Sequence, residues 1–303
     1  MDDLDFSHLV SATPQPAAPA AAPVARTAKA ETLPYDPQLA ARFFRIAGEE
    51  EVFEAGASVF VEQEKATGMF ARRARMYHLV DGQIALSLKG KPLYMVLPGE
   101  TFGELAIISD APRSATATAF KKSRVLSLDE KRILASLPRE PEFALQLVSS
   151  LAGQMRRGVE KLLAAGRGSL VPRLGGSGLN ADQLAKLRQC LGDPEPTLMK
   201  RGETVISQGA MGVNMYVVMR GRVTIGVNNK PVEQIGPGET FGEVALLGST
   251  TRSATAMAED DGAWLPVNRD AFLKIVATHP AVGVALLRSM CERVQHLNSQ
   301  MGA

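Results

Sequence analysis

The sequence contains two similar copies of one 22-residue segment. Residues 98–119 read PGETFGELAIISDAPRSATATA and residues 237–258 read PGETFGEVALLGSTTRSATAMA, with fourteen of the twenty-two positions identical. We call these stretches the first and second cassettes. Self-similarity of this length indicates two copies of one structural unit. The chain is therefore expected to fold as two similar domains in tandem, each large enough to bury its own core.

Weaker similarity extends the repeat well beyond the cassettes. Tyr77 aligns with Tyr216, and Gln38-Leu39-Ala40 aligns with Gln183-Leu184-Ala185. The offset between the copies is about 146 residues before the tyrosines and 139 after them. The first copy therefore carries roughly seven extra residues, which fall within 64–75.

The composition is that of an ordinary soluble protein. The 303 residues are 45% hydrophobic and carry a net charge of only +2. The basic excess of a broad nucleic-acid-binding surface is missing, so a nucleic-acid partner is not expected. No apolar stretch approaches the length of a membrane span, and the acidic N-terminus is not a secretory signal. We expect a cytoplasmic protein without membrane attachment.

Cysteine and histidine usage argues against a metal site. The two cysteines, Cys190 and Cys291, have no mate at a metal-ligand spacing, and the four histidines are scattered. Both thiols are predicted to be buried, reduced and structural. None of the histidines belongs to a Cys or Ser motif that would indicate a nucleophile.

Composition shifts divide the chain into four segments. Residues 11–34 are dominated by Ala and Pro, so 1–34 is predicted to be a flexible N-terminal segment. The Gly- and Ser-rich sequence near residue 170 predicts a linker at 166–179. The two domains are then expected at 35–165 and 180–303.

Each domain shows the same order of periodic patterns. Helical spacing is found at 36–48, 140–164 and 181–191, and further helices are expected from 270 to the C-terminus. Short alternating stretches between Gly, Pro and Asp turns predict strands over 52–128, with TATAF and RVLSL as separate strands, and over 197–267. The predicted fold class is α+β, with two tandem antiparallel β-barrel or jelly-roll domains, each flanked by helices.

In each cassette a glycine precedes a short apolar stretch. Gly103 and Gly242 allow the backbone to turn sharply and to approach a ligand closely. The apolar residues that follow, at 105–108 and 244–247, predict one or two helical turns. The N–H groups at the start of such a turn favour an anion.

The polar residues of the cassettes indicate a sugar phosphate. Arg113 and Arg252 follow a short loop after the helical turns, where a guanidinium could bind a phosphate through two nitrogens. Glu104 and Glu243 accept hydrogen bonds and suit sugar hydroxyls rather than an anion. The natural ligand is a phosphate next to a ribose hydroxyl, and two such sites are implied.

The pattern F-G-E-[LV]-A-[IL]-[IL] followed by R-S-A-T-A resembles the phosphate-binding cassette of the cyclic nucleotide-binding domain family. That family includes the regulatory subunits of cyclic-nucleotide-dependent kinases, the catabolite activator protein and cyclic-nucleotide-gated channels. The resemblance covers 52–128 and 198–267 with their flanking helices. It implies ligand contacts for these residues: Gly103, Glu104, Leu105, Ala106, Arg113, Ser114, Gly242, Glu243, Val244, Ala245, Arg252 and Ser253.

Within that resemblance, each residue type has a role. The two glutamates would bind the ribose 2′-hydroxyl, and the two arginines would bind the cyclic phosphate with help from the N–H groups of Ala106 and Ala245. Ser114 and Ser253 would lie near the phosphate and the base. A serine at this position allows either cAMP or cGMP, with cAMP favoured. Thr251 stands in the second cassette where the first has the usual proline.

Apolar residues outside the cassettes have several possible roles. Leu297 and Met301 are candidates to cover the base of the second nucleotide, whereas Trp264 is interpreted as a core residue. The apolar residues of 287–301 are spaced 3-4-3-4. They could form a dimer or partner seam, or they could pack on their own barrel.

The sequence predicts a non-enzymatic receptor. We expect it to bind one cAMP or cGMP per domain, without a metal, and to signal to an unidentified protein partner by conformational change. A homodimer is compatible with the heptad spacing. The alternatives are a transcriptional regulator and a scaffold whose nucleotide sites are vestigial. A phosphodiesterase is disfavoured because the sequence has no metal-ligand cluster.

Overall fold

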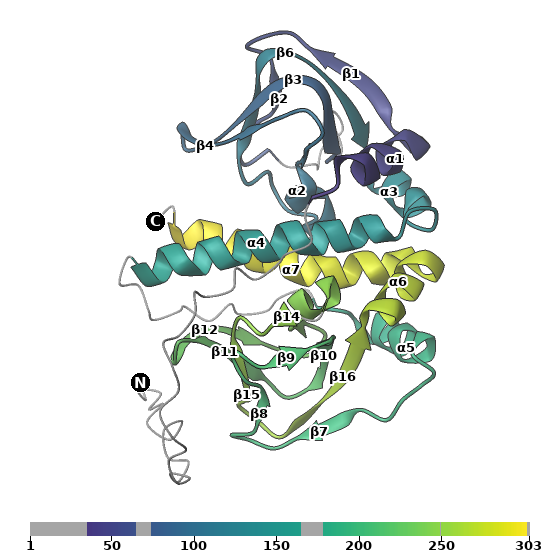
Figure 1. Ribbon diagram of the computed structural model, residues 1–303, viewed down its shortest axis with the longest axis vertical. Coiled ribbons are helices and arrows are strands. Elements are labelled where there is room, and N and C mark those ends of the chain that lie inside the picture. The colour runs from purple at the N-terminus through teal and green to yellow at the C-terminus, as the bar shows by residue number, and fades with distance from the viewer. Residues whose placement is uncertain (1–34, 65–73, 165–177, 249, 302–303) are drawn as a thin grey trace, which may run out of the picture.

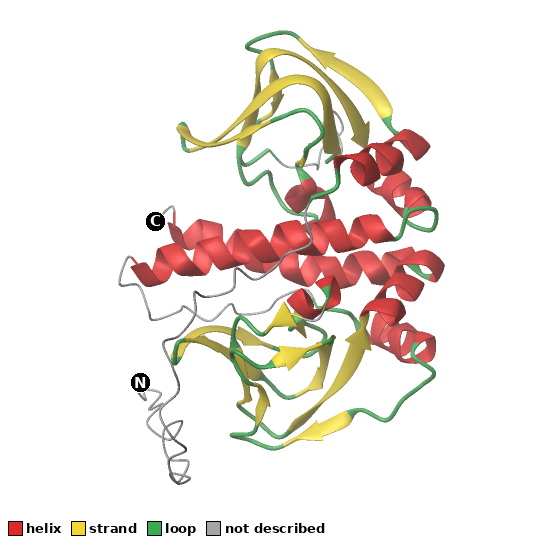
Figure 2. Cartoon of the chain, viewed as in Figure 1, coloured by secondary structure: helices red, strands yellow, loops and turns green. Residues whose placement is uncertain are grey.

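The computed structural model describes residues 35–64, 74–164, 178–248 and 250–301. The predicted N-terminal segment, most of the extra residues of 64–75 and nearly all of the predicted linker lie outside this part of the chain. Two β-sheet domains lie on opposite sides of a central layer of helices (Figures 1 and 2). The predicted fold class is confirmed.

In chain order the first domain contains α1 (Pro37–Ala47), β1 (Glu49–Phe53), β2 (Ser58–Phe60), β3 (Met76–Leu88), β4 (Lys91–Val96), β5 (Thr101–Phe102), α2 (Glu104–Ser109), β6 (Thr116–Leu128), α3 (Glu130–Ser136) and α4 (Glu142–Ala164).

The second domain contains α5 (Ala181–Cys190), β7 (Thr197–Met199), β8 (Thr204–Ile206), β9 (Met211–Gly212), β10 (Asn214–Arg220), β11 (Val223–Val227), β12 (Lys230–Ile235), β13 (Thr240–Phe241), the 3₁₀-helix η2 (Glu243–Leu247), β14 (Thr250–Thr251), β15 (Thr255–Ala258), β16 (Gly262–Asn268), α6 (Arg269–Thr278) and α7 (Pro280–Met301).

The first sheet is built around one long antiparallel pair. Its order is β1-β6-β3-β4, with β2 added on β6 and β5 on β3. The register runs from Met76 opposite Leu128 to Ser87 opposite Thr116. The prediction of two separate strands within β6 was wrong, because β6 stays paired with β3 through its polar middle, where Lys121 lies opposite Gln83.

The second domain divides its strands between two four-stranded sheets. Their orders are β13-β10-β16-β7 and β12-β11-β15-β8, and β14 pairs with β9 in a separate two-stranded ribbon. Trp264 lies on β16 and packs against the core of this barrel, with its ring edge-on to Tyr216, as the core interpretation predicted. The predicted strand region of 197–267 is therefore confirmed.

Side-chain caps explain where several helices begin. Asp36 accepts from the backbone N–H of Gln38, and Asn180 forms a full capping box with Gln183. Such caps satisfy N–H groups that have no partner inside the helix. Helix α3 was not predicted, although Asp129 caps it in the same way.

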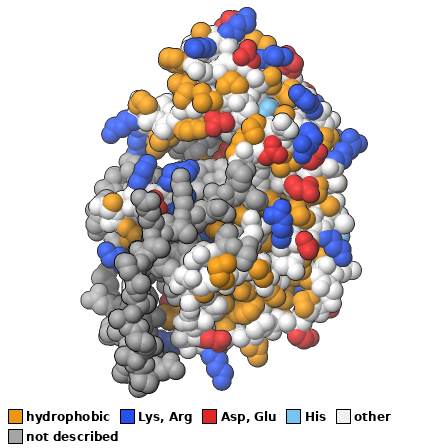
Figure 3. All heavy atoms as spheres, in the orientation of Figure 1, with side chains coloured by type: hydrophobic (Ala, Val, Ile, Leu, Met, Phe, Trp, Pro, Cys, Tyr) orange, Lys and Arg blue, Asp and Glu red, His pale blue; other side chains and the backbone are white. Residues whose placement is uncertain are grey.

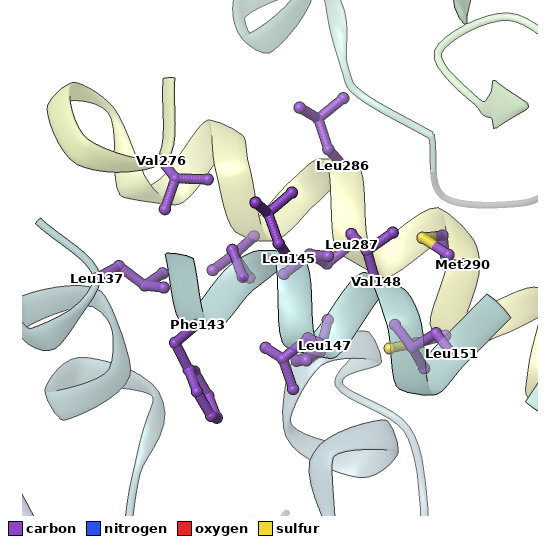
Figure 4. Close-up of a cluster of buried hydrophobic side chains, with 14 of the residues drawn as sticks. Leu137, Phe143, Leu145, Leu147, Val148, Leu151, Val276, Leu286, Leu287 and Met290 are labelled. Carbon is purple, nitrogen blue, oxygen red and sulfur yellow. The ribbon is translucent and has the colours of Figure 1, made fainter. Parts of the chain in front are cut away.

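Helices α4 and α7 run side by side in the same direction between the two barrels (Figure 1). Figure 4 shows Leu145, Val148 and Leu151 of α4 next to Leu287 and Met290 of α7. All five side chains are buried. Each barrel has a core of its own, but the largest core cluster contains side chains from both domains.

The heptad-like stripe of α7 has a different partner from either one expected. Leu287, Met290 and Val294 are buried in the shared core, and Leu297 lies against Gly158 of α4. The stripe is neither packed only on its own barrel nor left free for a second chain. It forms a seam with the equivalent helix of the first domain.

Candidate functional site

The glycine that precedes the short helix of each cassette makes the sharp turn that the sequence predicted. Gly103 has φ 81° and Gly242 has φ 76°, both in the left-handed region that glycine adopts without a steric penalty. A Cβ at Gly103 would lie 3.0 Å from Nη1 of Arg113, and one at Gly242 would lie 2.8 Å from Nη1 of Arg252. Glycine is therefore required both for the turn and for the approach of the arginine.

The short helices that follow differ between the two cassettes. The first is an α-helix of six residues, and the second is a 3₁₀-helix of five. In the second, the Ala245 N–H donates to the Gly242 carbonyl at 3.2 Å. The N–H group that was predicted to donate a hydrogen bond to the phosphate therefore already has an acceptor in the backbone. Leu105 and Ala106 are buried, whereas Val244 is half-buried.

Arg113, within the first cassette, is buried. Its Nη1 donates to the Gly103 carbonyl at 3.1 Å, and its guanidinium carbon lies 4.0 Å from the centre of the Phe60 ring. Burial lowers the pKa of Arg113, and the charges of Tyr77, Glu64 and Glu104 only partly oppose this effect. Among the described residues no carboxylate lies within ion-pair distance of this guanidinium.

Arg252 occupies the matching position in the second domain. Its Nη1 donates to the Gly242 carbonyl at 3.0 Å and its Nη2 donates to the Asn214 carbonyl at 2.8 Å. The guanidinium carbon lies 5.5 Å from the centre of the Tyr216 ring. Strand β9 passes so close that Gly212 has no room for a Cβ. Within the described chain Arg252 too has no carboxylate at ion-pair distance.

The two cassette glutamates are buried in different electrostatic surroundings. Glu104 accepts from Nε2 of Gln154, on α4, at 3.0 Å. Burial raises the pKa of Glu104, and Gln154 and Arg113 lower it to a smaller extent. Glu243 instead accepts from the Thr240 hydroxyl at 2.7 Å and from Nη1 of Arg293, on α7, at 2.6 Å.

Arg293 is a site residue that the sequence reasoning missed. Besides Glu243 it contacts Glu233 at 2.8 Å and the Thr240 carbonyl at 3.1 Å. Burial would lower its pKa, but Glu233 and Glu243 together raise it above its ordinary value. Arg293 and Gln154 are 139 residues apart, the same offset as the cassettes. The available signal was a charged residue inside an apolar helical stripe.

The remaining predicted residues are placed as follows. Ser114 is half-buried and Ser253 is exposed, each next to its arginine. Leu297, a candidate to cover the second base, is buried against Gly158 of α4. The side chain of Met301 lies outside the described part of the chain.

One cysteine departs from the prediction. Cys291 is buried, but Cys190 is only partly buried, because it ends α5 at the surface next to the junction of α6 and α7. Its Sγ lies 3.3 Å from Nδ1 of His279. An open cleft of about 550 Å³ beside α5 and α6 is lined by Cys190 and Lys274, and it contains none of the predicted ligand contacts.

Three further observations concern the described residues. No three His, Cys, Asp or Glu side chains in this part of the chain are placed to hold a metal ion. None of the described helices has both the length and the apolar character needed to cross a membrane. On the face in Figure 3, Lys and Arg side chains are interspersed with Asp and Glu.

One known protein family matches both halves of the chain. The family model of the cyclic nucleotide-binding domain matches residues 50–139 and 197–279, together more than half of the chain. The chain therefore belongs to the cyclic nucleotide-binding domain family and contains two such domains. The resemblance found in the cassettes is confirmed.

Curated relatives include kinases and a kinase subunit. The chain is 33% identical over 189 residues to a cAMP-dependent protein kinase regulatory subunit of Aspergillus niger, which covers 62% of this chain and 41% of the relative. It is 25% identical over 215 residues to a cGMP-dependent protein kinase of Drosophila melanogaster, covering 67% and 17%. The chain thus spans less than half the length of these relatives.

Solved structures of similar proteins include kinase regulatory domains and a bacterial activator. The regulatory domain of Toxoplasma gondii PKA with cAMP is 19% identical, with 81% of this chain and 96% of the other covered and a TM-score of 0.29. The catabolite activator protein of Thermus thermophilus is 20% identical, with 56% and 74% covered and a TM-score of 0.38. The family assignment depends on the sequence matches, because TM-scores this low do not establish a shared arrangement.

Proposed function

We propose that the protein is a non-enzymatic cyclic nucleotide receptor that binds one nucleotide in each domain. The observation that carries the proposal is a buried arginine beside a glycine turn in both cassettes. Within the described residues neither guanidinium has a carboxylate at ion-pair distance, and a buried guanidinium without an anionic partner is costly. A phosphate would supply that partner. Arg113 and Arg252 are the proposed phosphate ligands.

The carboxylates complete the proposed ligand. Glu104 and Glu243 lie at the start of the same cassette helices as the glycines, and an ionised carboxylate accepts hydrogen bonds from hydroxyl groups. We assign them to the ribose 2′-hydroxyl. The backbone of residues 103–106 and 242–245 and the two serines at 114 and 253 form the rest of each proposed site.

cAMP is the proposed ligand in preference to cGMP, and the proposed output is a change in the binding of a partner protein. The Aspergillus relative is named a regulatory subunit of a cAMP-dependent kinase, which supports both statements. The domain boundaries at 35–165 and 180–303 and the cytoplasmic location stay predictions from the sequence.

A calorimetric titration tests the ligand class. cAMP, cGMP and 5′-AMP are added separately to the protein, and 5′-AMP is the control because it keeps the base and ribose but lacks the cyclic phosphate. We expect heat of binding with cAMP, weaker binding with cGMP and none with 5′-AMP at the same concentration. If neither cyclic nucleotide binds, the proposed receptor function is wrong. The alternative of a scaffold with vestigial nucleotide sites is then favoured.

A further inference from the structure

Cys190 and His279 form a pair of reactive side chains outside both cassettes. Cys190 ends α5 and His279 lies between α6 and α7, so the fold brings together two residues that are 89 positions apart. Sγ of Cys190 lies 3.3 Å from Nδ1 of His279. A sulfur beside an imidazole is an arrangement that nucleophilic cysteines use. The proposed nucleotide sites use neither side chain.

The hydrogen bonds around His279 identify the nitrogen that carries a hydrogen. The Thr278 hydroxyl donates its only hydrogen to the Lys274 carbonyl at 2.8 Å. The same hydroxyl oxygen lies 2.9 Å from Nδ1 of His279, so the oxygen accepts there and Nδ1 donates. Nδ1 therefore presents an N–H group both to Thr278 and to the sulfur of Cys190.

This N–H group stabilises a negative charge on the sulfur. A thiolate accepts a hydrogen bond more strongly than a thiol does, and the thiolate is the nucleophilic form of cysteine. Because Cys190 is the last residue of α5, the carbonyl groups at the end of that helix have the opposite effect. The reactivity of Cys190 should therefore depend on His279.

The sulfur faces a cleft with room for a small molecule. Cys190 is partly exposed, and the open cleft that it lines has a volume of about 550 Å³. Sites for small molecules typically have volumes of roughly 300–1,000 Å³. The other lining residues come from β10, β16, α6 and the residue after α5. A group attached to the sulfur would therefore find a protein surface to contact.

Charges of both signs line this cleft. Asp270 and Lys274 lie one turn apart on α6, and both line the cleft. Neither charge has an ion-pair partner among the described residues. A ligand with one ammonium and one carboxylate group would complement such a pair of charges. Amino acids and short peptides are ligands of this kind.

We propose that Cys190 is a modification site that forms a mixed disulfide with a small zwitterionic thiol of the amino-acid or peptide class. The Cys190 thiolate attacks one sulfur of the symmetric disulfide of that thiol. A bond forms between Sγ and this sulfur while the original S–S bond breaks, and the second sulfur leaves with the electron pair. Cys190 is thereby oxidised, and the leaving half is reduced to a thiol that takes up the proton Cys190 released. The site does not depend on the proposed nucleotide function.

Reaction of the full chain with glutathione disulfide tests the proposal, because glutathione is a zwitterionic peptide thiol. Intact-mass spectrometry follows the formation of the adduct, and digestion identifies the modified cysteine. We expect one adduct at Cys190. Cys291 is the internal control, because it is 0% exposed and burial raises the pKa of its thiol, so it should stay unmodified in the folded protein. Cys190→Ser should abolish the adduct.

The role of His279 is tested by the rate of this reaction. His279→Phe keeps a ring but removes the N–H group, and it should slow adduct formation roughly fivefold or more through the loss of one charge-assisted hydrogen bond. His279→Asn retains an N–H donor and should recover part of the rate. Because His279 is exposed, neither substitution is expected to unfold the protein.

Lys274→Gln tests the charges of the cleft. It should slow the reaction with glutathione disulfide by roughly two- to fivefold, the effect of one exposed charge pair. It should accelerate the reaction with cystamine, a disulfide with a cationic group at both ends. Lys230→Gln is the matched control, because Lys230 is also exposed but lies on β12, away from the residues that line the cleft. This variant should change neither rate.

Two results would overturn the proposal. One is the absence of an adduct at Cys190 under conditions in which glutathione disulfide modifies the urea-unfolded chain. The other is a rate that both His279→Phe and Lys274→Gln leave unchanged, because Cys190 would then react only as an ordinary surface thiol.

Discussion

At the scale of single residues, the two domains differ in the helix side chain that donates to the cassette glutamate. In the first domain a neutral amide, Gln154, donates to Glu104, and in the second a guanidinium, Arg293, donates to Glu243. A buried carboxylate with only a neutral donor is expensive to ionise. The two carboxylates should therefore respond oppositely to the same chemical change.

Replacing Glu104 with glutamine should stabilise the protein at neutral pH. Because burial raises the pKa of Glu104, the folded state binds the proton more tightly than the unfolded state. The free energy of unfolding then falls as pH rises above the unfolded pKa of about 4.5. Urea unfolding of Glu104→Gln should give a higher value than the unchanged protein at pH 7, with the difference disappearing toward pH 4. Destabilisation at pH 7 would contradict this assignment.

Glu243→Gln is the matched variant with the opposite sign. It leaves Arg293 buried with only one carboxylate, Glu233. A charge-assisted hydrogen bond of this kind contributes about 1.5–3 kcal/mol, so we expect a loss of that order in the free energy of unfolding at pH 7. Equal effects of the two glutamine variants would show that the ion pair does not distinguish the sites.

The cassette glycine offers a second test at this scale. Gly103→Ala places a Cβ 3.0 Å from Nη1 of Arg113 and strains a residue with φ 81°. Gly56→Ala is the control, because Gly56 has φ 85° but no atom within 4 Å of the added Cβ. Both variants should lose on the order of 1 kcal/mol through backbone strain. Only Gly103→Ala should also weaken cAMP binding in a titration, and equal binding by both would contradict the predicted role.

At the scale of elements, the periodicity of the sequence located most helices and strands but not their partners. Helix α4 was expected at 140–164 and begins at Glu142. The stripe on α7 was predicted to form either a dimer or partner seam or a packing face on its own barrel. It packs instead on a helix about 140 residues earlier, and one sequence contains no signal that links the two helices. The pairing of Arg293 with Glu233 and Glu243 was not predicted for the same reason.

The α4–α7 seam should be sensitive to truncation. Met290 is 1% exposed in the shared core, whereas Met211 on β9 is 63% exposed. Removing a buried methionine side chain costs about 2–5 kcal/mol, because the cavity only partly collapses. Met290→Ala should therefore lower the free energy of unfolding by that amount in urea, and Met211→Ala should change it by about 0.5 kcal/mol or less. Similar effects of the two substitutions would argue against a buried seam.

At the scale of the whole molecule, the shared core joins the two domains. The repeat predicted two domains that each bury a core, and each barrel does have its own cluster. The largest cluster, however, combines residues of α1, α4, α6 and α7. The sequence could not show this sharing, because an apolar helix face looks the same whichever domain covers it.

Cooperative unfolding follows from that arrangement. Neither domain can lose its helices without exposing apolar surface of the other, so calorimetry should show one thermal transition for the full chain. Its calorimetric enthalpy should equal the van't Hoff enthalpy. Two resolved transitions would mean that the shared core does not join the domains energetically.

The most direct test of the central claim is the number of nucleotides bound. Equilibrium dialysis with labelled cAMP is compared for the unchanged protein, Arg113→Ala, Arg252→Ala and the double variant. Each arginine is expected to contribute about 1.5–3 kcal/mol, so its loss should weaken its own site at least roughly tenfold. At a cAMP concentration about ten times the dissociation constant of the unchanged sites, a site weakened tenfold is about half filled. We therefore predict close to two equivalents bound by the unchanged protein, about one and a half or fewer by each single variant and about one or fewer by the double variant. Unchanged binding in the double variant would contradict the assignment of both sites.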